Sequence, residues 1–127
     1  MTENTPVPHL RIRTKAWIEN EQGDLLFGKG KTEILELIES EGSIARAAEL
    51  MGLSYKKAWT HIKILQNNIA DELVVPRKGI SGGTVLTTKA AELIRNYRQL
   101  QKDLEAYADR RFQELFSEDP PNPANVE

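Results

Sequence analysis

The sequence contains no cysteine and only two histidines, and these shortages limit the chemistry that the chain can perform. Without cysteine there can be no disulfide, no thiol nucleophile and no cysteine-based metal site, a composition that fits a reducing compartment. His9 and His61 have no second histidine at the spacing of a metal site. We therefore expect no catalytic residues, no metal and no cofactor, and the chain is not predicted to be an enzyme.

Long hydrophobic runs are also missing. No stretch approaches the ~20 apolar residues of a membrane span, and the amino-terminal residues lack the charged-then-apolar order of a signal peptide. We expect a cytoplasmic protein with no membrane partner. The length of 127 residues predicts one domain with its own hydrophobic core.

The sequence does contain two amphipathic segments joined at a glycine, between Gly42 and Leu65. Ser43 and Ser54 stand where helix N-caps are expected, and Gly52 stands where a left-handed C-cap is expected. Apolar residues recur at helical spacing in both segments, at Ile44, Ala47, Ala48 and Met51 and then at Ala58, Ile62, Leu65 and Ile69. This layout is typical of a helix-turn-helix, which places its second helix in the major groove of DNA.

The second segment, about residues 54–67, is the predicted recognition helix. Its polar residues Lys56, Lys57, Thr60 and Lys63 lie largely off the apolar stripe. The whole chain has a net charge of −2, but from Ser54 to Lys89 six basic residues outnumber two acidic ones. Because lysines on such a helix can contact phosphates and base edges, this distribution favours a DNA-binding half. The alternative is an ordinary solvated face of a helical domain.

The predicted helix-turn-helix lies within a domain at residues 10–87, after a disordered lead-in at residues 1–9. Alternating apolar and polar residues predict a strand from Leu10 to Ile18, and Leu25–Phe27 is expected to return as the second strand of a hairpin. Residues 32–40 are expected to form the first helix, with Thr32 as a candidate cap and Gly42 just beyond its end.

A β-wing is predicted after the recognition helix. Residues 73–77 and 84–87 are prone to form strands, and the KGISGG sequence between them is rich in glycine. Arg77 and Lys78 could touch the DNA backbone or minor groove. Pro76 lacks a backbone donor, so it is expected on a sheet edge. The alternative is an ordinary exposed hairpin.

A long helix is predicted over residues 88–116, with Thr87 or Thr88 as its cap. Its apolar residues alternate at spacings of four and three, and they are Leu93, Tyr97, Leu100, Leu104 and Tyr107. Such a heptad seam requires a partner helix, for which we expect the same helix of a second copy. Packing along the amino-terminal hairpin is an alternative, and both can hold together. Residues 117–127 are expected to be a disordered tail.

The segment from Gly42 to Ile62 resembles the amino-terminal DNA-binding domain of ModE-type molybdate-responsive transcription regulators, chiefly over SYKKAW, and Val85-Leu86-Thr87 resembles that family's wing. This resemblance covers about residues 30–116, and the chain is more broadly similar to LysR-type winged helix-turn-helix domains. The resemblance implies a mainly α fold with small β elements, a homodimer and double-stranded DNA as the partner. It also implies DNA-binding roles for residues at or near the start of the recognition helix, namely Ser54, Tyr55, Lys56, Lys57 and Thr60. We further expect Ser43, at the start of the preceding helix, to bind DNA.

The chain departs from full-length members of that family, because it ends soon after the long helix. We therefore expect a stand-alone form without the carboxy-terminal molybdate-binding module. The alternative function is a dimeric protein-interaction module that docks a separate effector-sensing protein. Its docking surface would be the acidic stretch that contains Glu33, Glu36, Glu39 and Glu41.

Overall fold

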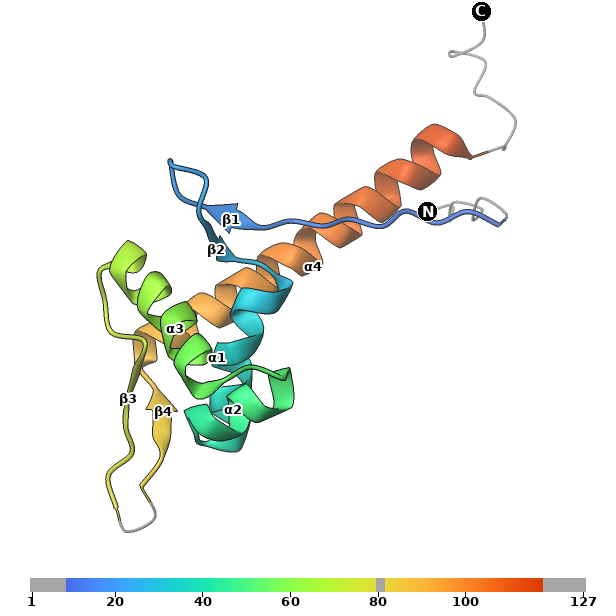
Figure 1. Cartoon of the computed structure of the whole chain (residues 1–127). Helices are drawn as coiled ribbons and strands as arrows, with labels where there is room; N and C mark the ends of the chain where they lie inside the picture. Colours follow the sequence, from blue (N-terminus) through green and yellow to red (C-terminus); the bar gives the residue numbers. More distant parts are fainter. Residues whose placement is uncertain (1–8, 80–81, 118–127) are drawn as a thin grey trace, which may run out of the picture. The chain divides into compact units, whose positions relative to one another are not determined.

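The computed structural model describes residues 9–79 and 82–117 (Figure 1). Most of the predicted lead-in and tail therefore lie outside the described residues. The chain divides into two compact units, Ala16–Arg98 and a second unit built from Met1–Lys15 with Gln99–Glu127. The order of elements is β1 β2 α1 α2 α3 β3 β4 α4. The structure confirms the predicted class, a mainly helical winged helix-turn-helix with small hairpins and a long final helix.

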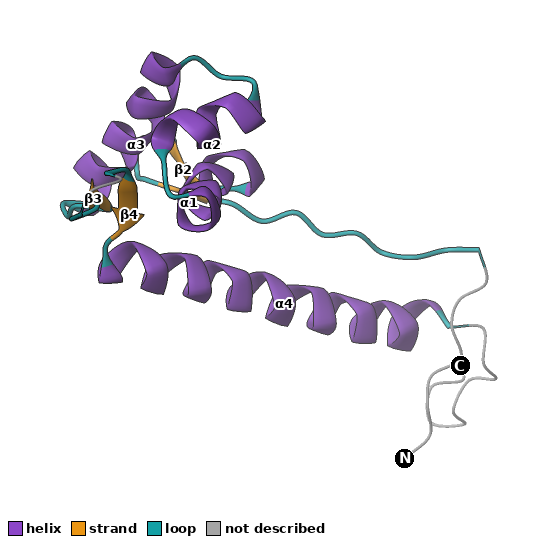
Figure 2. Cartoon of the chain, turned by 90° about the horizontal axis from the view of Figure 1, so that it is seen from below, coloured by secondary structure: helices purple, strands orange, loops and turns teal. Residues whose placement is uncertain are grey.

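Three helices make the core of the first unit (Figure 2). They are α1 at Lys29–Glu41, α2 at Ile44–Met51 and α3 at Tyr55–Ile69. Each contributes fully buried side chains, among them Ile38 of α1, Ala47 of α2 and Ile62 of α3. The small Ala47 and Ala58 are both 0% exposed, which allows α2 and α3 to pack closely. The predicted apolar stripes are confirmed as the buried faces.

The predicted caps Ser43, Gly52 and Ser54 are confirmed, and Gly42 lies just beyond the end of α1 as predicted. Gly42 and Gly52 adopt left-handed conformations with φ of 76° and 70°, which glycine reaches without a Cβ clash. The Ser43 and Ser54 hydroxyls accept the backbone N–H groups of Arg46 and Lys57 at 2.8 and 3.0 Å. Capping of this kind satisfies N–H groups that the first turn would leave unpaired.

The start of α1 differs from the prediction. Thr32 is not its cap, because the helix begins at Lys29 and Gly28 occupies the N-cap position. Thr32 is 2% exposed and its N–H donates to the Gly28 carbonyl at 3.0 Å. A Cβ on Gly28 would lie 3.4 Å from both the Trp17 Cβ and a Leu25 methyl. A Cβ at that distance would make ordinary van der Waals contact, so the chain already packs against Trp17 and Leu25 where α1 begins.

The amino-terminal hairpin is confirmed, but its first strand is much shorter than predicted. Only Ile18–Glu19 forms β1, which pairs antiparallel with β2 at Leu25–Phe27 across a register shift. Residues 10–17 are not a strand, because β2 is too short to offer them hydrogen-bond partners. The predicted strand from Leu10 to Ile18 is therefore wrong over residues 10–17, because alternation alone does not make a strand without a neighbour to pair with. The hairpin contributes Leu26 and Phe27 to the core.

The predicted wing is formed by β3 at Val74–Pro76 and β4 at Thr84–Leu86, which pair antiparallel (Figure 1). Pro76 lies opposite Thr84 in a sheet of two strands, so its missing N–H costs no bond to a third strand. Helix α4 follows at Thr88–Phe116, with the predicted boundaries. Thr87 is its cap, since its hydroxyl accepts the Ala90 N–H at 3.1 Å. Within the described residues, no helix is both long enough and apolar enough to cross a membrane.

Candidate nucleic-acid interface

The exposed face of α3 is the first part of the candidate interface. Ala58, Ile62 and Leu65 are 0% exposed and fix which side of the helix faces the core. The opposite side carries the predicted residues, all exposed, at Lys56, Lys57, Thr60 and Lys63. Since the Ser54 cap sets where the helix begins, it also sets which residues occupy the first exposed turn.

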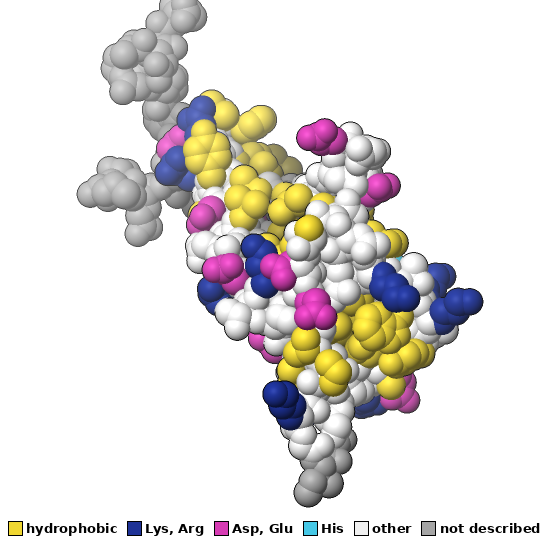
Figure 3. Space-filling view, turned by 90° about the vertical axis from the view of Figure 1, so that its left-hand side faces the viewer, with side chains coloured by type: hydrophobic (Ala, Val, Ile, Leu, Met, Phe, Trp, Pro, Cys, Tyr) yellow, Lys and Arg dark blue, Asp and Glu magenta, His cyan; other side chains and the backbone are white. Residues whose placement is uncertain are grey.

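The electrostatics of α3 favour an anionic partner. No acidic residue occurs between Tyr55 and Ile69, and none of the ion pairs among the described residues involves Lys56, Lys57 or Lys63. On the face shown in Figure 3, Lys and Arg side chains border a group of hydrophobic ones. Cations without acidic partners are available to neutralise phosphate.

Arg46 of α2 shows the contrasting arrangement. It is also exposed, but its guanidinium pairs with Glu49 at 2.7 Å and with Glu41 at 3.6 Å. The hydrogen bond and charge of Glu49 raise the pKa of Arg46 above its usual value. Because its charge is already balanced within the chain, Arg46 is a weaker candidate for phosphate binding than the α3 lysines.

An aromatic pair lies at the start of α3. Tyr55 is 53% exposed, and Trp59 is half-buried against the core one turn later. The Trp59 indole N–H donates to the Tyr55 hydroxyl oxygen at 2.9 Å. Tyr55 is one of the residues for which the resemblance implies a DNA-binding role. The hydrogen bond between Tyr55 and Trp59 was missed, although their spacing of four residues was a usable signal.

The wing is fastened to the helices at two points. At the loop end of its strands, the Thr84 N–H donates to the Gly42 carbonyl at 2.9 Å, which ties β4 to the junction of α1 and α2. At the other end, the Gln66 side-chain oxygen of α3 accepts the backbone N–H of Leu73 at 3.0 Å. The strands of the wing are therefore held to the elements that carry the helix-turn-helix. Neither tie could be read from local sequence patterns.

The predicted wing cations are both exposed. The Arg77 guanidinium lies over the α1–α2 turn, because a Cβ on Gly42 would be 2.7 Å from its Nη2. Ser43, which follows this glycine, uses its hydroxyl to cap α2 and is half-buried. Arg77 is thus close to the start of α2, while Lys78 continues toward the wing loop. The structure thus places Arg77 and Lys78 on the wing and Ser43 at the α1–α2 turn. The other predicted DNA-binding residues lie on α3 or, for Ser54, at its N-cap.

The predicted seam of α4 divides between two environments. Tyr97 is 7% exposed, contacts the Phe27 ring at 5.9 Å between centroids, and donates its hydroxyl to the Ala16 carbonyl at 3.0 Å. Leu93 is partly buried against the same core. By contrast, the seam residues beyond Arg98 are exposed, at 43%, 40% and 56% for Leu100, Leu104 and Tyr107. The amino-terminal part of the seam packs within its own chain.

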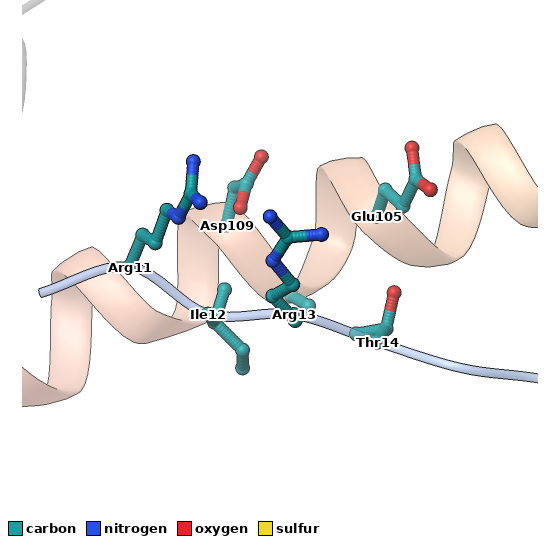
Figure 4. A pocket seen from close by; sticks show the side chains of 7 residues that line it. Arg11, Ile12, Arg13, Thr14, Glu105 and Asp109 are labelled. Carbon is teal, nitrogen blue, oxygen red and sulfur yellow. The ribbon is translucent and has the colours of Figure 1, made fainter.

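The second unit contains a shallow groove between residues 11–14 and α4 (Figure 4). Its volume is about 320 Å³, and Arg11 and Arg13 line it together with Glu105 and Asp109. Because two cations and two carboxylates share the groove, it does not present a single sign of charge. No group of three or more His, Asp or Glu side chains able to hold a metal occurs among the residues that the structure describes.

Comparison with known proteins identifies relatives of this chain. Residues 30–92 match the family of bacterial regulatory helix-turn-helix proteins of the lysR type. The chain is 39% identical over 87 residues to the molybdenum transport protein ModE of Azotobacter vinelandii, covering 67% of this chain and 32% of that protein. It is 33% identical over 108 residues to the DNA-binding transcriptional dual regulator ModE of Escherichia coli K12, covering 82% and 38% respectively.

A third relative is the molybdenum-pterin-binding protein MopB of Rhodobacter capsulatus, 36% identical over 77 residues, which cover 59% of this chain and 28% of that protein. The chain therefore spans about a third of the length of the curated relatives it matches. These matches confirm the predicted resemblance to ModE-type regulators.

Proposed function

The chain belongs, through residues 30–92, to the lysR family of bacterial regulatory helix-turn-helix proteins, and we propose that it regulates transcription by binding specific double-stranded DNA as a homodimer. DNA binding would make the cytoplasm its site of action. The proposal concerns the DNA-binding region that the chain shares with its longer relatives.

The observation that carries the proposal is the exposed face of α3. Three lysines and Thr60 occupy this face of a capped helix that has no acidic residue. An α-helix fits the major groove, where side chains near its start reach base edges and lysines reach phosphates. Arg77 and Lys78 of the wing would hold the backbone beside the groove.

Dimerisation rests on the exposed part of the α4 seam. Leu100, Leu104 and Tyr107 keep heptad spacing and remain accessible. A second copy would cover them and would bring two α3 helices to one DNA site. This arrangement makes paired half-sites the natural target.

The alternative, a module that docks a separate sensor protein through its acidic stretch, has less support. Glu36 pairs with Arg98 of α4 at 2.6 Å, and Glu41 pairs with Arg46. Part of the acidic surface is thus already balanced inside the chain, whereas the α3 lysines are not.

The test replaces Lys56 and Lys57 with alanine. Binding to a duplex enriched from a random-sequence pool should weaken about tenfold or more. The slope of log affinity against log salt should become shallower by about 0.9 for each phosphate that the variant no longer neutralises. Fluorescence anisotropy over a salt series measures both quantities.

Lys102→Ala is the matched control. Lys102 is exposed on α4 at a position away from the seam, so its removal should leave affinity and slope unchanged. If the double α3 variant behaves like this control, α3 does not face DNA. If the wild-type protein binds no duplex, the proposed function itself is wrong.

A further inference from the structure

The hydrogen bond between Trp59 and Tyr55 has a direction. An indole nitrogen carries a proton and has no acceptor lone pair, so in the 2.9 Å contact Trp59 is the donor and the Tyr55 oxygen is the acceptor. Trp59 is packed against the hydrophobic core, which restrains the position of its N–H. The Tyr55 oxygen is therefore held at a fixed place one turn away on the surface of α3.

This contact determines which hydrogen bonds the Tyr55 hydroxyl can still form with a ligand. A phenol hydroxyl has one proton to donate, and the Trp59 contact does not use it. No acceptor for this proton occurs among the residues that the structure describes, and the Tyr55 side chain is 53% exposed. The proton is consequently free to point away from Trp59, at the exposed first turn of α3 that also contains Lys56 and Lys57. Tyr55 is a pre-oriented hydrogen-bond donor.

The hydroxyl of Thr60, which is also exposed on α3, is in a different state. Its hydroxyl donates to the Lys56 carbonyl at 3.0 Å, so its only proton is used within the helix. Toward a ligand Thr60 can offer acceptor lone pairs and a methyl group, but no donor. Of these two hydroxyls, Tyr55 alone can donate to an oxygen of DNA.

We propose that Trp59 is a positioning residue that aims the Tyr55 hydroxyl at an acceptor oxygen of DNA, on a phosphate or a base edge. This inference rests on the proposed DNA binding and adds a neutral donor to the charged contacts of α3. Because a phenol is uncharged, the contact releases no counterion. It should therefore affect affinity at every salt concentration equally.

The central variant is Tyr55→Phe, which removes one oxygen and keeps the ring. We expect binding to weaken about tenfold, as for one hydrogen bond to a charged acceptor, with an unchanged salt slope. Two duplexes distinguish the acceptor. Equal weakening on the enriched duplex and on a mixed-sequence duplex indicates a phosphate, and weakening on the enriched duplex alone indicates a base edge.

The role of Trp59 is tested by a double-mutant cycle. Trp59→Phe should weaken binding about threefold in the wild type and should have no further effect in the Tyr55→Phe background, since it acts through that hydroxyl. Thermal unfolding of each variant separates an effect on stability from an effect on binding. In addition, the NMR signal of the Trp59 indole N–H should move upfield in Tyr55→Phe, because its acceptor is gone.

Tyr97→Phe is the matched control, because it removes the same phenol oxygen from a ring that is buried in the core and donates to the Ala16 carbonyl. Its affinity for the mixed-sequence duplex should equal that of the wild type. The inference is overturned if Tyr55→Phe binds both duplexes as the wild type does, or if the two aromatic substitutions are additive. A wild-type protein that binds neither duplex overturns the proposed function, and this inference with it.

Discussion

Two adjacent glycines in the wing have different local surroundings. Gly82 and Gly83 have φ values of 68° and 99°, so both adopt backbone conformations that other residues rarely take. A Cβ on Gly82 would meet nothing within 4 Å, whereas a Cβ on Gly83 would lie 2.6 Å from the Gly42 carbonyl oxygen. That oxygen is the acceptor that ties β4 to the α1–α2 turn. Gly83 is therefore needed for close approach as well as for its φ.

Gly83→Ala should destabilise the domain more than Gly82→Ala. The left-handed conformation alone costs about 1–2 kcal/mol in either variant. In Gly83→Ala the new methyl also pushes against backbone, which cannot move aside as a flexible side chain could. Urea unfolding of the two variants gives the difference in the free energy of unfolding.

Gly82→Ala is the matched control for this prediction, since it changes the same loop at the neighbouring position. We expect Gly83→Ala also to weaken DNA binding, because the wing is then no longer tied to the turn. Equal free energies of unfolding for the two variants would show that the wing is not anchored through Gly42.

Helix α4 has two roles along its length. Its first turns complete the core of the first unit, where Ala90 and Ile94 are buried beside Tyr97. Arg98 adds an ion pair to Glu36 of α1 at 2.6 Å. Beyond this point the seam residues are exposed. A single regular heptad pattern in the sequence thus serves intramolecular packing first and, in our proposal, dimerisation afterwards.

Leu104→Glu should therefore convert the proposed dimer to a monomer without unfolding the domain. Two glutamates facing each other across the seam would repel and would bury charge. Tyr97→Phe should act differently, because it removes only the hydrogen bond to the Ala16 carbonyl. It should lower the free energy of unfolding by about 1 kcal/mol and leave the dimer intact. Sedimentation velocity and thermal unfolding measure the two effects.

Lys102→Glu provides the control for the charge change, since Lys102 lies away from the seam on the same helix. It should remain in the same oligomeric state as the wild type. A wild-type protein that is monomeric at micromolar concentration, or a Leu104→Glu variant that stays dimeric, would contradict the proposed role of the exposed seam.

At the scale of the whole molecule, the distribution of charge matters more for DNA binding than the net charge does. The chain has a net charge of −2, yet α3 has three lysines and no acid. Where basic residues do have acidic neighbours, as at Arg46 and Arg111, those neighbours raise their pKa values above the usual value. A protein that is acidic overall can therefore still present one cationic face to DNA.

A homodimer should require correctly spaced half-sites. Two α3 helices in successive major grooves read sites about one helical turn or somewhat more apart. Inserting about five base pairs between the half-sites rotates one of them to the opposite side of the duplex. Affinity should then fall to the level of a single half-site. An electrophoretic mobility shift with the enriched duplex and its lengthened version measures this decrease.

Substituting the same central base pairs without changing the length is the control, and it should preserve most of the affinity. If the lengthened duplex binds as well as the original, the two copies do not read one site together. That result would leave DNA binding by α3 intact and would remove the dimeric mechanism.

The local sequence predicted the helix-turn-helix accurately because its signals are local. Ser43 and Ser54 act as caps through hydrogen bonds that span three residues, and Gly52 ends α2 through its own backbone conformation. The boundaries of α4 followed in the same way from Thr87 and the apolar repeat. Such features depend on neighbours in the chain, so one sequence suffices to find them.

The errors and omissions concern contacts between distant residues. Leu10–Trp17 alternates as a strand would, but β2 offers pairing only near Ile18. Thr32 looks like a cap, yet α1 begins at Lys29 with Gly28 as its N-cap, and Thr32 is buried inside the helix. In the first case, a local pattern was overruled by the absence of a partner elsewhere in the chain.

The sequence by itself thus determined the helices, their caps, the wing and the cationic face of α3, because periodicity and capping act over a few residues. Only the tertiary structure decided how these parts are held. It provided the Gly42 carbonyl for Thr84, the Gln66 oxygen for Leu73 and the burial of Tyr97 against Phe27. It also decided which seam residues remain exposed. Such contacts join residues that are remote in the chain, and they form only when the core has brought the elements together.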